Sequence, residues 1–501
     1  MTTYLRPGVY VQETLNPIQP VVGPSSNTVA AFLGANDRGP TTPTLVSSWS
    51  DYTTKFGTWN TSVGNDLPLA LYTFFANNQS PVYVTRVVGS GASAATRSLN
   101  DRAGSPQPTL KVSANKVGAW GNTLNVTISD SATTGYFNLI VYFGGSAAAN
   151  IVEQWTDITM VSSDARYALN VVNSNSQYIT LVDLGSSSSG VTKNPSVLTN
   201  QALSTGANGA SVTGTAIAGA LPLYDVIPQS LVLNAPNYTD DTTVNALIAY
   251  AEGRGDVFVV VDGVADTVAN QLTLAASYTN SSHAAVYYPQ ITIADPTVGV
   301  GAPKTATKTL GAGAAVIGLY AATDASRGVF KAPAGLQTRI ATAVSVTPLS
   351  NSDLDTLNSS NPPVNAIRFI SGSGIVVMGS RTLKSGYVDK YVPVRRTLIY
   401  LEKSLKDLTQ FAIFEPNDAR LWTRINATLN SFLTGFWTQG GLTGNTPAAA
   451  YFVKCDAETN PQSAIDNGIV NIQVGVALQR PAEFVVINIG QYSGGTTVTV
   501  A

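Results

Sequence analysis

Two apolar segments constrain the fold of this chain most strongly. Residues 256–263 are Asp-Val-Phe-Val-Val-Val-Asp-Gly, and residues 284–289 are Ala-Ala-Val-Tyr-Tyr-Pro. Apolar runs without polar alternation are typical of strands buried on both faces, as in a parallel sheet covered by helices. The segment 28–90 has the order strand, helix, strand of an α/β unit, with strand patterns at 28–34 and 82–88 around a helical pattern at 66–75. The sequence therefore predicts an α/β architecture.

A different pattern interrupts this alternation. Residues from about 89 to 109 are rich in Ser, Ala, Gly and Pro, which predicts a linker. Short alternating segments follow at 124–128, 136–143 and 178–182, and turn residues separate them, which favours a small β-rich domain. The strand and helix alternation resumes after about residue 205, so we expect the β-rich domain to be inserted into the α/β domain.

The last 120 residues predict an α+β domain. A helical pattern at 394–410 places four leucines on one face: Leu398, Leu401, Leu405 and Leu408. We expect Asn417 to cap a second helix with a wide apolar stripe that ends at Gly440. Two strand patterns follow, at 470–476 and 484–489. Their sheet would be open to the addition of a further strand.

The two ends of the sequence predict extended arms. Residues 8–13 alternate, and the prolines that follow at 17, 20 and 24 exclude a helix. Residues 496–501 are β-prone and follow a glycine pair. The patterns together predict an N-terminal arm (1–25), an α/β domain in two parts (26–90 and 206–378), a β-rich insert (91–205), a C-terminal α+β domain (379–490) and a C-terminal strand arm (491–501).

Composition argues against several classes of function. Charged residues are 12% of the chain, roughly half the ~25% of a typical soluble domain, and a weakly charged polar surface suits a protein packed against copies of itself. The net charge of −2 provides no basic field for nucleic acid. Cys455 and His283 are the only residues of their types, so we expect no disulfide and no Cys- or His-based metal site. We also expect no signal peptide and no membrane insertion.

Catalytic and cofactor motifs are incomplete. The segment 311–316 begins like a dinucleotide loop but lacks the third glycine, and 353–355 begins like a calcium loop but lacks the required glycine. There is no GxSxG motif, and a catalytic triad would have to use His283, for which a polar loop position is the simpler interpretation. Asp256, Asp262 and Asp324 are better explained as residues that cap turns. The sequence predicts no enzyme, no cofactor and no metal.

The segment 381–424 is an electrostatic exception, because it holds nine basic and five acidic residues. One interpretation is a solvated helical face with local ion pairs, and the other is a surface for an acidic protein partner. The residues that could contact such a partner are Lys403, Lys406, Arg420 and Arg424.

Several ordered motifs resemble contractile tail sheath proteins of bacteriophages and related injection systems. The similar segments are 4–13 (Tyr-Leu-Arg-Pro-Gly-Val-Tyr-Val-Gln-Glu), 31–34, 38–40, 48–52, 118–122, 327–335 and 364–368. The most specific lie near the C-terminal end, at 394–396 (Val-Arg-Arg), 414–418 (Phe-Glu-Pro-Asn-Asp), 421–422 and 481–484 (Pro-Ala-Glu-Phe). The resemblance spans nearly the whole chain and is weakest between 90 and 210.

The resemblance implies a structural subunit that polymerises helically around an inner tube and contracts from a metastable extended state. It also implies a subtilisin-like α/β middle domain and a C-terminal α+β sheath domain that terminal strands complete. The arms would add strands to a neighbour's sheet. The donors would be Val9, Tyr10, Val11, Val498 and Val500, and the receiving sheet would contain Val470, Ile472, Val474, Phe484 and Val486.

The implied partners are many copies of the same chain, the inner tail tube protein, and baseplate and tail-terminator proteins. The implied location is a virion tail assembled in the host bacterial cytoplasm. Two alternatives stay open at this point: a lattice-forming surface or adhesin protein, and, less favoured because the triad is missing, a subtilisin-like hydrolase.

Overall fold

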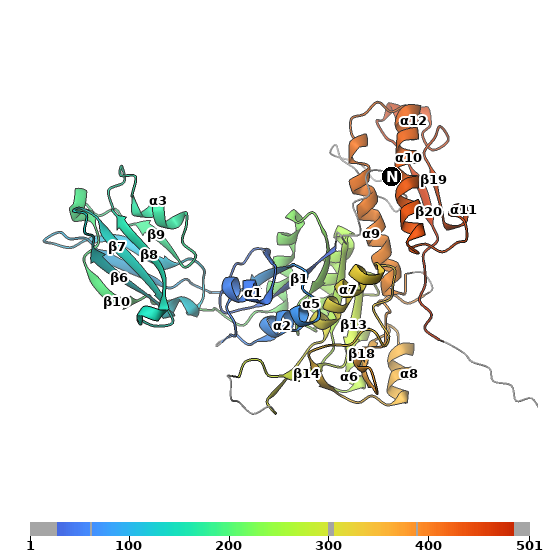
Figure 1. Ribbon diagram of the computed structural model, residues 1–501, viewed down its shortest axis with the longest axis horizontal. Helices are drawn as coiled ribbons and strands as arrows, with labels where there is room; N and C mark the ends of the chain where they lie inside the picture. The colour runs from blue at the N-terminus through green and yellow to red at the C-terminus, as the bar shows by residue number, and fades with distance from the viewer. Residues whose placement is uncertain (1–27, 61–62, 299–304, 387–388, 485–501) are drawn as a thin grey trace, which may run out of the picture.

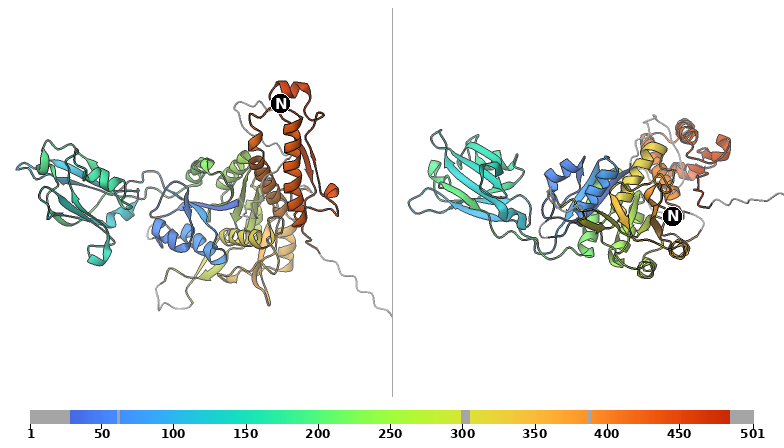
Figure 2. Two further views of the ribbon diagram at one scale, coloured as in Figure 1. Left: turned by 45° about the horizontal axis from the view of Figure 1, so that its top comes forward. Right: turned by 60° about the horizontal axis from the view of Figure 1, so that its bottom comes forward.

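A computed structural model describes residues 28–60, 63–298, 305–386 and 389–484 of the 501-residue chain. The described residues form three parts (Figures 1 and 2). A central α/β part lies between a β-rich part, made by residues that interrupt the central sheet in sequence, and a helical C-terminal part. The predicted mixed α/β and multidomain architecture is confirmed.

An eight-stranded sheet forms the central part, with the strand order β18-β17-β13-β12-β11-β1-β3-β2. The six inner strands are parallel, while β2 and β18 pair antiparallel at the two edges. The strands are β1 (Thr28–Ala35), β2 (Thr44–Val46), β3 (Val82–Val87), β11 (Ser230–Asn234), β12 (Val257–Asp262), β13 (Ala284–Tyr288), β17 (Asn365–Ile370) and β18 (Gly374–Val377).

Helices on both faces explain the apolar runs. Along β12, Phe258 and Val260 contribute to one hydrophobic core, whereas Val257, Val259 and Val261 contribute to the other. The first core includes residues of α1 (Trp49–Phe56), α2 (Asp66–Asn77), α7 (Gly313–Arg327) and α9 (Val392–Leu408). The second includes residues of α4 (Gly214–Ala220), α5 (Asp241–Arg254), α6 (Val268–Ala276) and α8 (Asn351–Ser359). A small sheet of β14 (Ile291–Ala294), β15 (Thr307–Leu310) and β16 (Ala343–Val346) lies beside them.

The β-rich part contains two antiparallel sheets around one core. One sheet consists of β4 (Thr96–Asn100), β5 (Pro108–Ala114) and β9 (Ile179–Asp183), and the other of β6 (Leu124–Asp130), β7 (Phe137–Phe143), β8 (Ile151–Ile158) and β10 (Leu198–Ala202). Helix α3 (Ala168–Asn173) packs beside β9. The predicted linker at 89–109 is wrong in part, because β4 lies within it. Leu99 is buried opposite Leu110, the Gly- and Ser-rich residues 89–93 precede β4, and residues 101–107 form the turn between β4 and β5.

The C-terminal part is α+β, as predicted. Its elements are α9, α10 (Ala419–Thr438), α11 (Pro447–Ala450), β19 (Tyr451–Lys454), α12 (Gln462–Asp466) and β20 (Gln473–Val476). The predicted cap at Asn417 is wrong: the Asp418 carboxylate accepts the N–H groups of Arg420 and Leu421, and Asn417 instead binds the Trp422 indole. Asp418 stands directly before the helix, at the position from which a side-chain oxygen reaches the free amides of the first turn.

The predicted strands of this part are shorter than expected. Residues 470–472 precede β20 and are not part of it, and Phe484 lies outside any strand. Residues 485–489 of the second predicted strand lie outside the described residues. Among the helices of the described residues, none combines the length and apolar character that a membrane crossing requires.

Candidate assembly interface

The carboxyl edge of the central sheet, where open α/β sheets commonly bind ligands, is closed by the chain itself. Asp262 at the end of β12 accepts the N–H of Gly313 at the start of α7 (2.6 Å) and the N–H of Asn237 (2.9 Å). A Cβ atom on Gly311 would lie only 2.2 Å from the Asp262 carboxyl carbon. The segment that begins like a dinucleotide loop therefore binds an internal carboxylate at the helix N-terminus, where a phosphate would otherwise bind.

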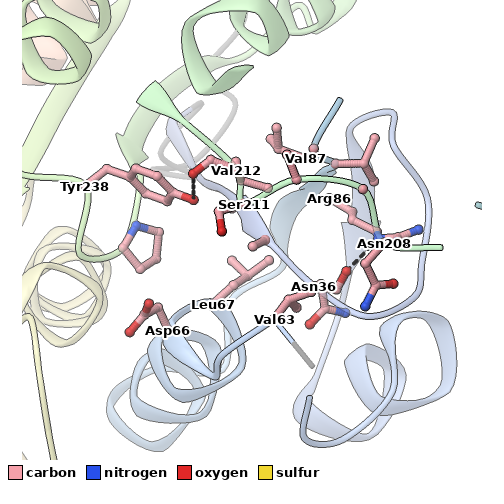
Figure 3. Close-up of a pocket in the computed structure, with 17 residues that line it drawn as sticks. Asn36, Val63, Asp66, Leu67, Arg86, Val87, Asn208, Ser211, Val212 and Tyr238 are labelled. Atoms are coloured by element: carbon pink, nitrogen blue, oxygen red, sulfur yellow. Dashed lines mark hydrogen bonds between the residues drawn. The ribbon is translucent and has the colours of Figure 1, made fainter. Parts of the chain in front are cut away.

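A cavity of about 270 Å³ lies beyond the ends of β1 and β3, and Arg86 lines it (Figure 3). The buried guanidinium donates through Nε to the carbonyl of Asn36 (2.7 Å) and through one terminal nitrogen to the carbonyl of Val117 (2.7 Å). Burial lowers the pKa of Arg86 to about 10. Because Val117 belongs to the β-rich part, Arg86 fastens that part to the central sheet.

The residues considered for catalysis do not meet. His283 lies in the turn before β13, in the predicted loop position, but it is buried there, and its Nδ1 lies 2.8 Å from the backbone oxygen of Val257 in β12. Asp256 pairs with Arg254, and Asp324 pairs with Arg396 in the interior. Within the described ranges, no three His, Cys, Asp or Glu side chains form a group that could hold a metal ion.

The strands β19 and β20 form a two-stranded sheet, and within the described ranges each of them pairs only with the other. Ala477 donates its N–H to the carbonyl of Ala450 (2.8 Å), which fixes the pairing. Because hydrogen-bonded and non-hydrogen-bonded pairs alternate in an antiparallel ladder, the backbone groups of Val474 and Val476 point away from β19. In the part of the chain that the structure describes, no third strand pairs with this sheet. Val474, a predicted receiving residue, therefore lies on an edge that can accept a strand.

Helix α10 supports one face of this sheet, and the other face is exposed. Tyr451, Val453, Val474 and Val476 pack into the C-terminal core together with Leu429 of α10. Val470 and Ile472 also pack against this core, although they precede β20. The rigid apolar support holds the edge in place.

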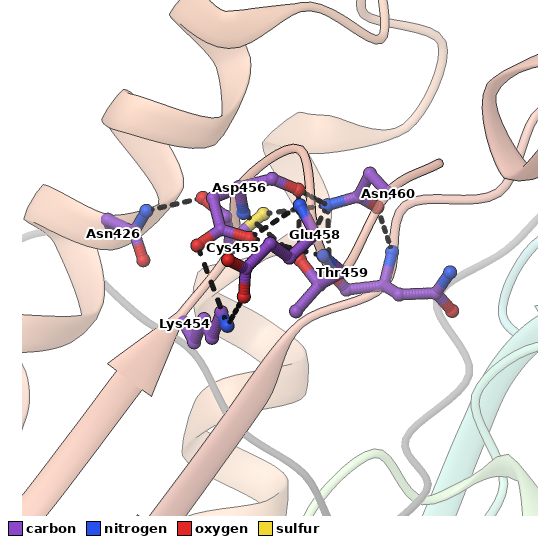
Figure 4. Close-up of polar contacts among 8 residues, drawn as sticks. Asn426, Lys454, Cys455, Asp456, Glu458, Thr459 and Asn460 are labelled. Atoms are coloured by element: carbon purple, nitrogen blue, oxygen red, sulfur yellow. Dashed lines mark hydrogen bonds and ion pairs between the residues drawn. The ribbon is translucent and has the colours of Figure 1, made fainter. Parts of the chain in front are cut away.

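The turn after β19 is fixed by Asn460 (Figure 4). Its buried side chain donates to the carbonyls of Asp456 (3.0 Å) and Asn471 (3.0 Å), and it accepts the N–H of Asn471 (2.5 Å). Asn426 of α10 donates to the carbonyl of Cys455 (2.7 Å). These contacts join the turn to the segment before β20. Burial raises the pKa of the Cys455 thiol to about 11, which keeps it protonated.

The segment before the C-terminal arm is anchored to the central part. Arg381 binds the Glu483 carboxylate through two nitrogens (2.8 and 2.6 Å), and the Tyr391 hydroxyl donates to the same carboxylate (3.1 Å). Burial raises the pKa of Glu483, but these hydrogen bonds and the Arg381 charge outweigh it and lower the pKa overall. Phe484, the next residue, is 71% exposed.

The four predicted tube-facing residues lie near the connection between α9 and α10. Lys403 is half-buried and 3.3 Å from Asp407, and the Arg424 guanidinium lies over the Phe411 ring at 4.2 Å. Lys406 and Arg420 are exposed. Much of the positive charge of the 381–424 segment is neutralised internally, by Glu483, Asp324 and Glu402.

The arm residues Val9, Tyr10, Val11, Val498 and Val500, and the receiving residue Val486, lie outside the described residues. Sequence reasoning gave no role to Asn460, to the Arg381–Glu483 pair or to the Arg396–Asp324 pair. Arg396 and Glu483 occur in the quoted motifs, but their partners are 72 and 102 residues away in sequence. No local pattern connects residues at such separations.

Comparisons with known proteins agree on one family. The phage tail sheath protein central domain matches residues 214–383, and the phage tail sheath C-terminal domain matches residues 389–491. Together the two matches span more than half of the chain. No protein of curated function matches the chain in sequence.

Three solved structures illustrate the shared fold. The sheath complex of the extracellular contractile injection system PVC, in its contracted state, has 22% identity and a TM-score of 0.60 over 98% of this chain and 99% of that chain. The anti-feeding prophage helical sheath, also contracted, has 22% identity and a TM-score of 0.59 over 98% and 100%. The sheath tail protein Lin1278 from Listeria innocua has 15% identity and a TM-score of 0.62 over 90% and 94%.

The predicted absence of enzymatic activity follows from the family, since its members are structural subunits of contractile tails. The chain belongs to the phage tail sheath protein family.

Proposed function

We propose that this chain polymerises helically around an inner tube, is held in a metastable extended state, and contracts to drive the tube through a target cell envelope. The observation that carries the proposal is the two-stranded sheet, whose β20 edge offers free backbone groups on a rigid helical support. An edge strand of this kind is a template for a strand from another chain.

In this proposal the N-terminal arm at 1–25 and the C-terminal arm at 491–501 supply the added strands, through Val9, Tyr10, Val11, Val498 and Val500. Main-chain hydrogen bonds would then link neighbouring subunits and keep them joined while the subunits rotate. The Arg381–Glu483 anchor supports this arrangement, because it fixes the point from which the C-terminal arm leaves the subunit.

Truncation tests the strand exchange. We expect that deletion of residues 1–15 or of residues 494–501 leaves a folded monomer that forms no long sheaths. Circular dichroism would check the fold, and electron microscopy would check assembly. Tubes of normal length from either truncated chain would contradict the proposal.

We also propose that the α9–α10 connection faces the tube and that Lys403, Lys406, Arg420 and Arg424 contact it. The exposure of Lys406 and Arg420 supports this orientation. Reversing the charge of Lys406 and Arg420 should weaken tube-templated assembly and its dependence on salt. Unchanged assembly would remove these residues from the tube contact.

We also propose contacts with baseplate and tail-terminator proteins, assembly in the bacterial cytoplasm, a subtilisin-like fold of the central part, and domain limits at 26–90, 91–205, 206–378 and 379–490. The contracted and baseplate-bound sheaths of similar fold support the first of these.

A further inference from the structure

A groove of about 640 Å³ lies where the central part meets the C-terminal part. Apolar atoms of Phe330, Val364 and Met378 line it. Four cationic side chains also line it: Arg327, Lys331, Arg368 and Arg480. The groove therefore combines an apolar surface with concentrated positive charge.

Acidic side chains of the described residues leave these four cations without a neutralising partner. In the part of the chain that the structure describes, none of them forms an ion pair. Of the two acidic residues in the groove, Glu483 is already bound by Arg381, which leaves Asp355. Burial and the charge of Arg327 lower the pKa of Lys331, as expected when no anion compensates the cations.

An acidic surface lies at the carboxyl edge of the central sheet. Asp240 and Asp241 at the start of α5 and Asp266 just before α6 are exposed, and β11 and β12, which precede these helices, are adjacent. None of the three pairs with a cation within the described ranges. The surrounding sequence from 220 to 298 holds eight acidic residues and one arginine, whereas residues 327–396 hold nine basic and three acidic residues.

The two surfaces cannot pair with each other inside one subunit. Helix α7 begins at the carboxyl edge, where Gly313 binds Asp262, and its 15 residues end at Arg327 in the groove. At 1.5 Å per residue this separates the two surfaces by about 22 Å. Complementary surfaces at different places on one chain make heterologous contacts, which generate open helical arrays unless they close into rings.

We propose that the groove receives the acidic edge of a second copy of this chain, so that copies meet head to tail through ion pairs. The inference rests on the proposed function, since it concerns assembly of copies, and it adds a contact that does not use the terminal arms. The apolar lining excludes water from the ion pairs and so strengthens them.

Charge reversal in the full-length chain tests the contact. Arg368→Glu with Arg480→Glu reverses the groove, and Asp241→Lys with Asp266→Lys reverses the edge. We expect either pair alone to lower the fraction of protein that sediments as polymer at least tenfold, and all four changes together to restore it. Lys116→Glu is the matched control, because Lys116 is exposed in the β-rich part, and it should assemble like the unsubstituted chain.

A crosslinking experiment tests directly whether the groove of one copy lies close to the acidic edge of another. The buried, protonated Cys455 is the only native cysteine, so new cysteines react alone. After assembly, a short bismaleimide should join Asp241→Cys to Met378→Cys in a ladder of multimers, and Lys116→Cys with Met378→Cys should give none. Tubes without the ladder, or without rescue by the fourfold variant, would overturn this contact and leave the proposed function intact. An unsubstituted chain that forms no tubes would overturn both.

Discussion

At the scale of single residues, one buried ion pair joins two parts of the molecule. Arg396 of α9 binds Asp324 of α7 through two nitrogens, and both side chains are less than 5% exposed. The Arg396 guanidinium also lies over the Tyr320 ring at 4.5 Å. Since α9 contributes to both the central and the C-terminal cores, this pair sets how the two parts pack.

Asp324→Asn should destabilise the fold by about 3–5 kcal/mol, because it leaves Arg396 buried without its counter-charge. Urea unfolding followed by circular dichroism would measure the change. The matched control is Asp355→Asn, at an exposed position of α8, which should stay within about 0.5 kcal/mol. Equal stability of the two variants would show that the pair does not hold the parts together.

A second residue makes the β-rich part sensitive to acid. Hydrogen bonds from the Ser186 hydroxyl and the Gln107 N–H hold the pKa of Asp101 at about 2. An unfolded Asp titrates near 3.9, so this contribution to stability is complete above that pH and is lost as the pH falls towards 2. Hydrogen exchange between pH 5 and pH 2.5 should therefore accelerate in β4 and β5. In Asp101→Asn the acceleration should be smaller, and an unchanged pH profile would contradict this role.

At the scale of elements, the sequence predicted the helices and strands that depend on the local order of apolar and polar residues. The strand β12 follows directly from its uninterrupted apolar run, and the leucine face of α9 and the apolar stripe of α10 follow from helical periodicity. The sequence-based predictions were wrong where a contact with a distant residue determines the local structure. Asn417 and Asp418 are both good caps, and only the position of Trp422 assigns Asn417 to another bond. The strand β4 has a composition typical of a loop and is a strand because it pairs with β5.

The candidate interface was predictable only in part, because some of its features follow from local pattern and others depend on tertiary contacts. Alternation identified Val474 as a strand residue. The turn that positions this strand depends on Asn460 and Asn471, whose contacts no periodicity reports.

Asn460→Ala should loosen the β19–β20 pair, because it removes the side chain that binds both the backbone N–H and the carbonyl of Asn471 just before β20. The expected cost is about 2–3 kcal/mol. Hydrogen exchange at Gly475, whose N–H faces Phe452 of β19, and thermal unfolding would measure the effect. Asn467→Ala is the control, since that side chain is exposed and makes one local hydrogen bond to the carbonyl of Ser463. If both variants exchange at the same rate, Asn460 does not position the strand.

At the scale of the whole molecule, the parts are fastened together rather than loosely tethered. Arg86 fastens the β-rich part to the central sheet, and the Arg396–Asp324 and Arg381–Glu483 pairs fasten the C-terminal part and the segment after it. A subunit of this kind can move as a unit, while its unpaired sheet edge remains available to a neighbour. These features suit a subunit that assembles with copies of itself into a polymer.

Negative-stain electron microscopy of the full-length, tag-free chain, concentrated at neutral pH, tests this claim most directly. We expect hollow tubes of helically arranged subunits in the absence of any other protein. Flat sheets, or monomers that persist at high concentration, would contradict it.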